Sequence, residues 1–406
     1  MSSHPVSQSI RSLYEAYPYP SRIPGGSADP FLDLLWSYCG DPHDLSRSFL
    51  DAGCGTGLNV LGGAILYPHY QVYGCDLNRV ALDTLRSEAD ALNLQNLHLK
   101  EMDLLNLEPD FGPSAGFDII YSTGVIHHTA DPVGILKSMA SRLAPQGILR
   151  LMVYGELGRS DLYRFATVAR KLYGKTEWSE RVGLARSLMQ ELEAAARQRD
   201  SFLPPVFRGP WEDAQRVDDV EFADRYLNPH DQPFTITKLK ETVEQAGLQF
   251  LDWFEPREWD LDRLLPQFAS TRAAPQDRWE RFRLIEQLFD RPKFDLYLVG
   301  PEYKKRELEL NNHTYLGLNP QLFVQTIKAR GVSIQRMAQL RLGTEEPLTR
   351  DEGTLLDTFG LRFMTTEAIV SEMPDPSLEK WTPIVQGLLD KNFLFSPHPL
   401  QSSPLF

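Results

Sequence analysis

The chain alternates short apolar runs with longer amphipathic stretches between residues 48 and 154. Short apolar runs bounded by glycine or polar residues predict buried strands, whereas apolar residues spaced by three and four predict helices. The predicted strands are 48–53, 71–76, 97–103, 117–122 and 147–154, and the predicted helices between them are 58–67, 79–92 and 132–144. Because strands that alternate with helices build βαβ units, this pattern predicts an α/β fold with a doubly wound, mostly parallel sheet.

Helical patterns precede, interrupt and follow this region. Helices are predicted at 6–17 and 29–39 before the first strand, at 162–174 and 180–199 after the fifth, and at 320–330, 333–341, 365–373 and 382–392 in the tail. The strand–helix rhythm resumes between the last two groups, with helices at 236–247 and 278–289 and strands at 248–254 and 293–300. A short strand is expected near 393–397.

These changes of pattern divide the chain into five segments. They are an N-terminal lid at 1–45, the core at 46–155, an inserted helical cap at 156–233, the remainder of the core at 234–300, and a mainly helical, winged-helix-like module at 301–406.

Composition narrows the class of protein. The 406 residues are 42% hydrophobic and 24% charged, which is typical of a packed globular protein. The net charge of −13 disfavours general binding to nucleic acid, whose phosphates would be repelled. Three cysteines without a metal-type pair indicate a reducing compartment. Because the first residues lack a basic start and an apolar run, and no stretch is long enough to span a bilayer, we expect a soluble cytoplasmic protein.

The stretch DAGCGTG places Gly53, Gly55 and Gly57 at every second position between a predicted strand and a predicted helix. Glycines allow a sharp turn and a close approach to a ligand, and the helix N-terminus offers free N–H groups to a phosphate or a carboxylate. Asp51 lies just before the glycines and would repel a phosphate. We therefore expect a ligand that carries a positive amino group.

Two further acids follow the next strands. Asp76 ends the second strand, 19 residues after Gly57, where an acid accepts hydrogen bonds from ribose hydroxyls. Asp103 ends the third strand, where it can hold the exocyclic amine of adenine. Together these positions fit a ligand with a ribose, an adenine, an amine and a carboxylate.

The ordered set LDAGCGTG, an acid after the second strand, EMD, FDIIYSTGVIHHTADP and LAPQGILRLMVY resembles the class I S-adenosylmethionine-dependent methyltransferases. The resemblance covers residues 48–154 and continues more loosely to about 300. It implies a Rossmann-like sheet and S-adenosylmethionine as cofactor, with the glycines holding the methionine part, Asp76 the ribose and Asp103 the adenine. The expected cofactor-binding residues are Asp51, Gly53, Cys54, Gly55, Gly57, Asp76, Leu77, Met102, Asp103, Leu104, Ser122 and Gly124. NAD is disfavoured by the glycine spacing and by Asp51.

His127 and His128 follow the fourth strand, whose carboxyl end faces the ligand crevice in this fold. Methyl transfer needs a base when the nucleophile carries a proton, and histidine accepts a proton near neutral pH. His128 is the first candidate base and His127 the second; the alternative is that they pack or cap the next helix. We expect no metal, since no further ligands stand at metal spacing. Asp131 is the expected N-cap of that helix.

Two flanking segments have open interpretations. In YEAYPYPSR, which resembles a segment that folds over the cofactor in some relatives, Tyr14, Tyr19 and Arg22 reach the cofactor or acceptor, or their rings pack in a surface strap. Tyr19 is the third catalytic candidate. In YLNPHDQPFTI, His230 and Asp231 point at the acceptor, or Asp231 caps a turn. Candidates for the border of the acceptor pocket are Asp161 and Tyr163.

The tail carries basic residues without acids between 310 and 343, namely Lys328, Arg330, Arg336 and Arg341. A solvated helix face explains them more simply than an acidic or RNA partner, and protein contact, as a homodimer or with a substrate, is the preferred role of the module. The predicted reaction is methyl transfer to an N or O nucleophile, with a protein or peptide side chain as acceptor. The alternatives are a specialised metabolite as acceptor, or a cofactor-bound scaffold without catalysis.

Overall fold

The structure of the chain is a computed structural model. It describes residues 5–21, 47–197, 214, 216–305, 310–319, 322–328, 334–340, 346–359, 362–391 and 393–396. These fall into two compact units, one with residues 5–21 and 47–301 and the other with residues from 302 onward. The helix predicted at 29–39 and the side chain of Arg22 lie outside the described residues. No helix among the described ranges combines the length and apolar character needed to cross a membrane.

The first unit is built on a seven-stranded sheet in the order β3-β2-β1-β4-β5-β7-β6. Its strands are β1 (Ser48–Ala52), β2 (Gln71–Asp76), β3 (Leu97–Glu101), β4 (Phe117–Thr123), β5 (Leu143–Tyr154), β6 (Gln249–Trp253) and β7 (Lys293–Val299). The first five pair in parallel, whereas β7 runs antiparallel to both β5 and β6. The predicted doubly wound α/β sheet is confirmed, and the chain order reverses between β1 and β4.

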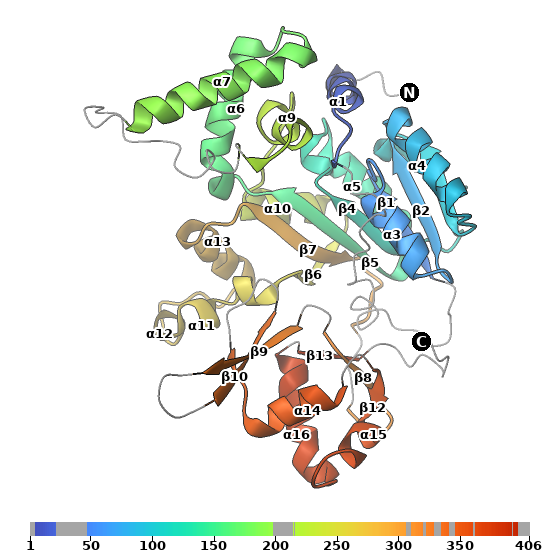
Figure 1. Cartoon of the computed structure of the whole chain (residues 1–406), viewed down its shortest axis with the longest axis vertical. Helices are drawn as coiled ribbons and strands as arrows, with labels where there is room; N and C mark the ends of the chain where they lie inside the picture. The colour runs from blue at the N-terminus through green and yellow to red at the C-terminus, as the bar shows by residue number, and fades with distance from the viewer. Residues whose placement is uncertain are drawn as a thin grey trace. The chain divides into compact units, whose positions relative to one another are not determined.

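Some helices pack against this sheet, whereas those of the inserted segment lie away from it (Figure 1). The helices of the first unit are α1 (Pro5–Ala16), α3 (Leu58–Leu66), α4 (Arg79–Ala91), α5 (Pro132–Ala140), α6 (Ser160–Tyr173), α7 (Trp178–Arg197), α9 (Asp219–Leu227), α10 (Ile236–Gln245), α11 (Leu261–Leu264), α12 (Pro266–Ala269) and α13 (Arg278–Leu288). Four short 3₁₀ helices join them, η1 (Leu104–Asn106), η2 (Ile126–His128), η3 (Leu157–Arg159) and η4 (Pro256–Trp259). The predicted N-cap is confirmed: Gly134 N–H donates to Asp131 Oδ1 over 2.8 Å at the start of α5.

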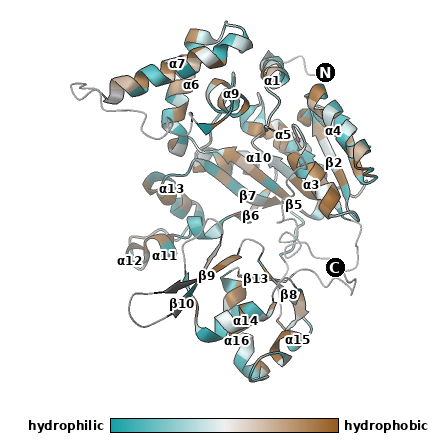
Figure 2. Cartoon of the chain, viewed as in Figure 1, coloured by the Kyte–Doolittle hydropathy of each residue, from teal (hydrophilic) through white to brown (hydrophobic). Residues whose placement is uncertain are grey.

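A second hydrophobic core joins the N-terminal helix to the inserted cap. Leu13 of α1 is buried with Phe165 of α6, Ala185 of α7 and Phe222 of α9. Figure 2 shows hydrophobic and hydrophilic residues along α7, as expected of a helix that buries one face. The lid and the cap thus share one core, although about 150 residues separate α1 from α6 in the chain.

The second unit combines two three-stranded sheets with helices, in the orders β11-β10-β9 and β12-β8-β13. Its elements are β8 (Tyr315–Leu318), β9 (Leu322–Lys328), β10 (Ile334–Leu340), β11 (Glu346–Pro347), α14 (Arg350–Phe359), β12 (Met364–Thr365), α15 (Thr366–Ser371), α16 (Leu378–Asp390) and β13 (Leu394–Phe395). The helices predicted at 365–373 and 382–392 are confirmed as α15 and the second part of α16.

Two other helix predictions in this unit are wrong. Residues 322–328 and 334–340 form the antiparallel strands β9 and β10, paired from Leu322↔Leu340 to Lys328↔Ile334. Strand pairing overrides their helix-like apolar spacing, and β-branched residues favour the strand. Arg336 lies on β10 and forms a bidentate pair with Asp357 at 2.6 and 2.7 Å. This basic residue is therefore neutralised within the unit and does not belong to a solvated helix face.

Candidate active site

A cavity of about 600 Å³ opens at the carboxyl ends of the central strands, where the chain order reverses. This is the position at which doubly wound sheets bind ligands. Its wall includes Tyr14, Tyr19, Asp51, Gly53, Cys54, Gly55, Asp76, Leu77, Met102, Asp103, Leu104, Gly124, Val125, His128 and Tyr154. The structure therefore brings to one cavity most of the residues that the sequence analysis selected.

Among the expected cofactor-binding and catalytic residues, three do not line the cavity. Gly57 is the N-cap of α3, and its backbone is left-handed with φ of 87°. Ser122 is fully buried within β4, and its hydroxyl has no hydrogen-bond partner. His127 is also fully buried, behind the cavity wall.

The glycine loop lies directly against the N-terminal lid. Gly55 has a positive φ of 52°, and a Cβ atom added there would lie 2.4 Å from the carbonyl oxygen of Tyr19. Thr56 N–H donates to that same carbonyl over 3.1 Å, and the Thr56 hydroxyl donates to Pro20 O over 2.9 Å. The missing side chain at Gly55 thus permits the lid to dock on the loop.

Two carboxyl groups, the buried Asp51 and the partly buried Asp76, lie on either side of this loop. Asp51, near the end of β1, accepts one hydrogen bond from Asn59 Nδ2 at 3.3 Å, and burial raises its pKa to about 7. Asp76, at the end of β2, accepts from the N–H groups of Gly55 and Asn78, each at 2.8 Å, and burial raises its pKa despite these bonds. No described lysine or arginine forms an ion pair with Asp51; Arg150, whose charge lowers the pKa of Asp51, is paired with Asp295 at 3.0 Å.

The far end of the cavity is more apolar. Met102 and Leu104 are buried there on either side of Asp103. The Asp103 carboxyl caps η1 by accepting from Leu105 N–H over 3.0 Å. An acid between two apolar side chains can receive a flat ring that carries a hydrogen-bond donor.

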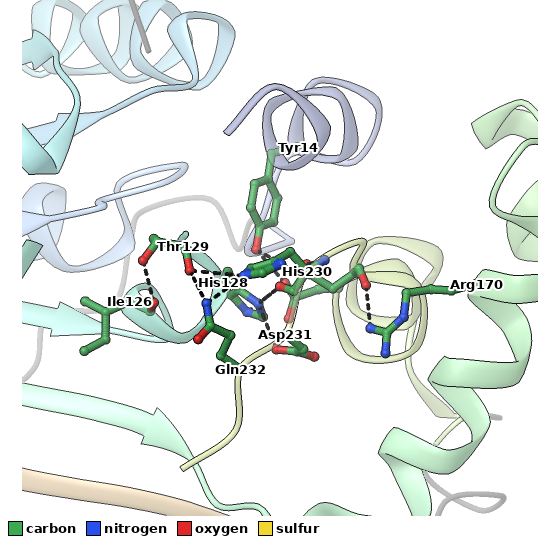
Figure 3. A network of polar contacts seen from close by, with 10 residues as sticks. Tyr14, Ile126, His128, Thr129, Arg170, His230, Asp231 and Gln232 are labelled. Carbon is green, nitrogen blue, oxygen red and sulfur yellow. Dashed lines mark hydrogen bonds and ion pairs between the residues drawn. The ribbon is translucent and has the colours of Figure 1, made fainter. Parts of the chain in front are cut away.

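His128 lies at the opposite end, in η2, within a group of buried polar side chains (Figure 3). Its Nδ1 atom is 3.2 Å from the carbonyl oxygen of His230 and 3.0 Å from Asp231 Oδ1. Both neighbours are acceptors, so Nδ1 carries the proton in the neutral ring and Nε2 is the basic nitrogen. Burial lowers the pKa of His128, but Asp231, Asp224 and the His230 carbonyl outweigh this effect and the pKa is raised.

Sequence analysis missed Asp224, which completes this group. Asp224 Oδ1 lies 4.0 Å from His128 Nε2 and accepts a hydrogen bond from the Tyr14 hydroxyl over 2.8 Å. Figure 3 shows Tyr14 projecting from α1 toward His128. The sequence held one signal for this residue. Asp224 stands among apolar residues of α9 that are buried, and charged residues are rarely buried without a partner.

His127 has a different environment. Its ring lies 4.1 Å from that of His128 and 4.2 Å from that of Tyr154, centroid to centroid, and neither ring nitrogen has a partner. Burial, His128 and the cations Arg159 and Lys238 lower its pKa well below the ordinary value, so the ring is neutral. His127, His128 and Asp231 each offer one atom that could bind a metal ion, and these three atoms lie within 4.8 Å of one another. Sequence spacing did not indicate this group.

The remaining acceptor-side candidates lie in several places. The His230 ring lies 3.2 Å from the carbonyl oxygen of Thr129. The contact of His230 with His128 is made by the backbone oxygen of His230, at 3.2 Å. Asp161 pairs with Arg164 at 3.4 Å on the outer face of α6. Tyr163 is mostly buried, and its hydroxyl has no hydrogen-bond partner.

Comparison with known proteins agrees with this arrangement. The model of a family described as a methyltransferase domain matches residues 50–149. An uncharacterized protein from a Synechococcus strain is 31% identical over 301 residues, which cover 70% of this chain and 69% of that protein. A trans-aconitate 2-methyltransferase from an Acidovorax strain is 23% identical over 211 residues, which cover 52% of this chain and 72% of that enzyme.

Among solved structures, PKMT2 from Rickettsia typhi in complex with AdoHcy shares the fold, with a TM-score of 0.70 at 18% identity. The alignment covers 93% of this chain and 77% of that one. The sheet, the glycine loop and these matches define a methyltransferase. The chain belongs to the class I S-adenosylmethionine-dependent methyltransferase family, and S-adenosylmethionine is its cofactor.

Proposed function

We propose that the protein transfers the methyl group of S-adenosylmethionine to an N or O nucleophile on a protein or peptide side chain. Asp51 fits the amino group of the cofactor, because a buried carboxyl group without a cation gains one on binding. Asp76 would hold the ribose, and the missing side chains of Gly53 and Gly55 would let the methionine part of the cofactor lie close to the loop backbone. Asp103, between Met102 and Leu104, would hold the adenine.

The His128 geometry is the observation that carries the proposed reaction. A buried imidazole on the cavity wall has acceptors at Nδ1 and, among the described residues, no hydrogen-bond partner at Nε2. This is the arrangement of a general base whose ring is oriented by a carboxylate. Such a base is useful only when the nucleophile loses a proton, as an alcohol, phenol, thiol or ammonium group does.

The second unit supports a macromolecular acceptor. It has its own hydrophobic core, which includes Leu316, Leu355 and Trp381, and the described residues that line the cavity all belong to the first unit. A separately packed unit that is not needed to enclose the cofactor fits a role in contact with a protein. The likeness to trans-aconitate 2-methyltransferase favours a small metabolite as the second candidate acceptor.

The test is incubation with S-adenosylmethionine labelled in the methyl group and a cell extract, followed by separation of protein, RNA and small molecules. We expect label in protein, and we expect His128→Gln to remove most of it while S-adenosylhomocysteine still binds. Label only in small molecules would select the metabolite alternative. Bound cofactor with no label in any fraction would contradict catalysis and favour a scaffold.

A further inference from the structure

Asp224 is a buried carboxyl group that lacks a permanent cation. Its side chain is 3% exposed, and one of its oxygens, Oδ2, is buried without a hydrogen-bond partner. No described lysine or arginine pairs with it: Arg225 on the same helix pairs with Glu221, and Arg170 donates to a backbone carbonyl. Buried carboxylates are normally paired, so this position is short of one positive charge.

The acids around Asp224 increase this deficit. Burial raises the pKa of Asp224 and the negative charges of Asp231 and Glu221 raise it further, whereas His128 and the hydrogen bond from Tyr14 lower it. Tyr14 supplies a neutral hydrogen bond only. Arg159 is a partly buried arginine of the same region. Its guanidinium lies 3.4 Å from the centre of the Tyr154 ring and interacts electrostatically with Asp231.

Asp224 lies directly behind the cavity wall. Tyr14 and His128 both line the cavity, and Asp224 Oδ1 is 2.8 Å from the hydroxyl of the first and 4.0 Å from Nε2 of the second. Asp224 does not itself line the cavity, but the 4.0 Å separation is short enough for one nitrogen to lie about 3 Å from both His128 Nε2 and Asp224 Oδ1. The tyrosine rings that line this end, Tyr14, Tyr19 and Tyr154, favour a cation next to them.

We infer that Asp224 is the counter-ion of a protonated primary amine on the acceptor, so that the enzyme methylates amino groups rather than carboxylates or phenols. This inference rests on the proposed function and narrows it. An ammonium group offers three N–H donors and no acceptor, which suits Asp224 and His128 Nε2. A carboxylate would be repelled by Asp224 and Asp231, and a phenol would leave Asp224 without a cation.

The reaction then proceeds in balanced steps. The acceptor ammonium gives one proton to His128 Nε2 and becomes a neutral amine. The lone pair of the amine forms a bond to the methyl carbon, and the carbon–sulfur bond breaks with its electron pair remaining on sulfur. The products are a methylammonium group beside Asp224, S-adenosylhomocysteine, and a proton that His128 returns to water.

The experiment uses the full chain with labelled S-adenosylmethionine and four probes. These are the acetyl, N-methylamide derivatives of lysine, norleucine, glutamate and tyrosine. We expect transfer to the lysine probe alone, detected as a gain of one methyl group by mass spectrometry. We expect Asp224→Asn to lower kcat/KM for this probe at least tenfold while S-adenosylhomocysteine affinity stays within twofold. The matched control is Asp219→Asn, an exposed acid on the same helix, which should change neither quantity.

The outcomes separate this inference from the function on which it rests. Transfer to the tyrosine or glutamate probe in preference to lysine would keep the methyltransferase assignment and overturn the amine. Unchanged lysine kinetics in a folded Asp224→Asn variant would overturn the role of Asp224. Loss of transfer on adding a chelator would overturn the proposed proton path in favour of a metal at His127, His128 and Asp231. If Asp224→Asn does not fold, the inference is tested by the wild-type enzyme alone: methylation of the lysine probe supports an amine acceptor, and methylation of another probe in preference to it overturns that inference.

Discussion

Binding of the cofactor product should release a proton from Asp51. Burial raises the pKa of this carboxyl group to about 7, so about half of the molecules carry the proton at pH 7 and about nine-tenths at pH 6. A ligand ammonium beside Asp51 favours the ionised form and lowers its pKa. Binding of S-adenosylhomocysteine should therefore release about half a proton at pH 7, more at pH 6 and little at pH 8.

The raised pKa of Asp51 also determines how the stability of the unliganded protein depends on pH. A carboxyl group with a raised pKa in the folded state stabilises the unliganded protein below its unfolded pKa, and this contribution is lost as the pH rises through about 7. Calorimetry in two buffers of different ionisation enthalpy measures the released protons. Asp51→Asn should abolish the release, and Asp83→Asn, an exposed acid on α4, should preserve it. Equal binding heats in both buffers at pH 6 and 7, or an unchanged release in Asp51→Asn, would refute this account.

Three further predictions concern the cofactor loop and the fold. Asp76→Ala removes the acceptor of two backbone N–H groups at 2.8 Å, so the glycine loop loses its anchor. Hydrogen bonds to a charged group contribute about 1.5–3 kcal/mol each. The affinity for S-adenosylhomocysteine, measured by calorimetry, should fall at least about 100-fold. Gly55→Ala places Cβ 2.4 Å from the Tyr19 carbonyl at a positive φ and should cost about 1–3 kcal/mol in thermal unfolding, whereas Gly183→Ala, with open space around it, should not destabilise. Thr235→Ala removes the N-cap of α10 and should cost about 1 kcal/mol without changing cofactor affinity.

The gathering of the proposed cofactor-binding residues at one cavity was predictable because it follows local order in the chain. A glycine loop after the first strand and an acid after each of the next two strands must meet at one edge of a parallel sheet. The structure places Gly53, Asp76 and Asp103 on one cavity wall for this reason. Ser122 is buried within β4 and does not line the cavity; residues on a strand alternate between faces, and sequence alone did not establish which face its side chain takes.

The second unit shows where local pattern was insufficient. Residues 322–328 and 334–340 have apolar residues at spacings that suit a helix as well as a strand. What decides between the two is pairing between strands, since β10 bonds to β9 on one side and to β11 on the other. A short apolar run cannot reveal its partner, so such segments remain ambiguous until the neighbouring strands are known.

The group of side chains around His128 was not predictable, because its members are even farther apart in the sequence than paired strands are. Its members come from α1, η2, α9 and the loop before α10, and the hydrogen bond from Tyr14 to Asp224 joins residues 210 positions apart. The lid also contacts the cofactor side, because Asn78 Nδ2 donates to the backbone carbonyl of Tyr14 over 2.9 Å. One residue of α1 therefore touches both the loop after Asp76 and the carboxyl group beside His128. Because α1 makes both contacts, the positions of Asp224 near His128 and of the loop after Asp76 depend on the same helix.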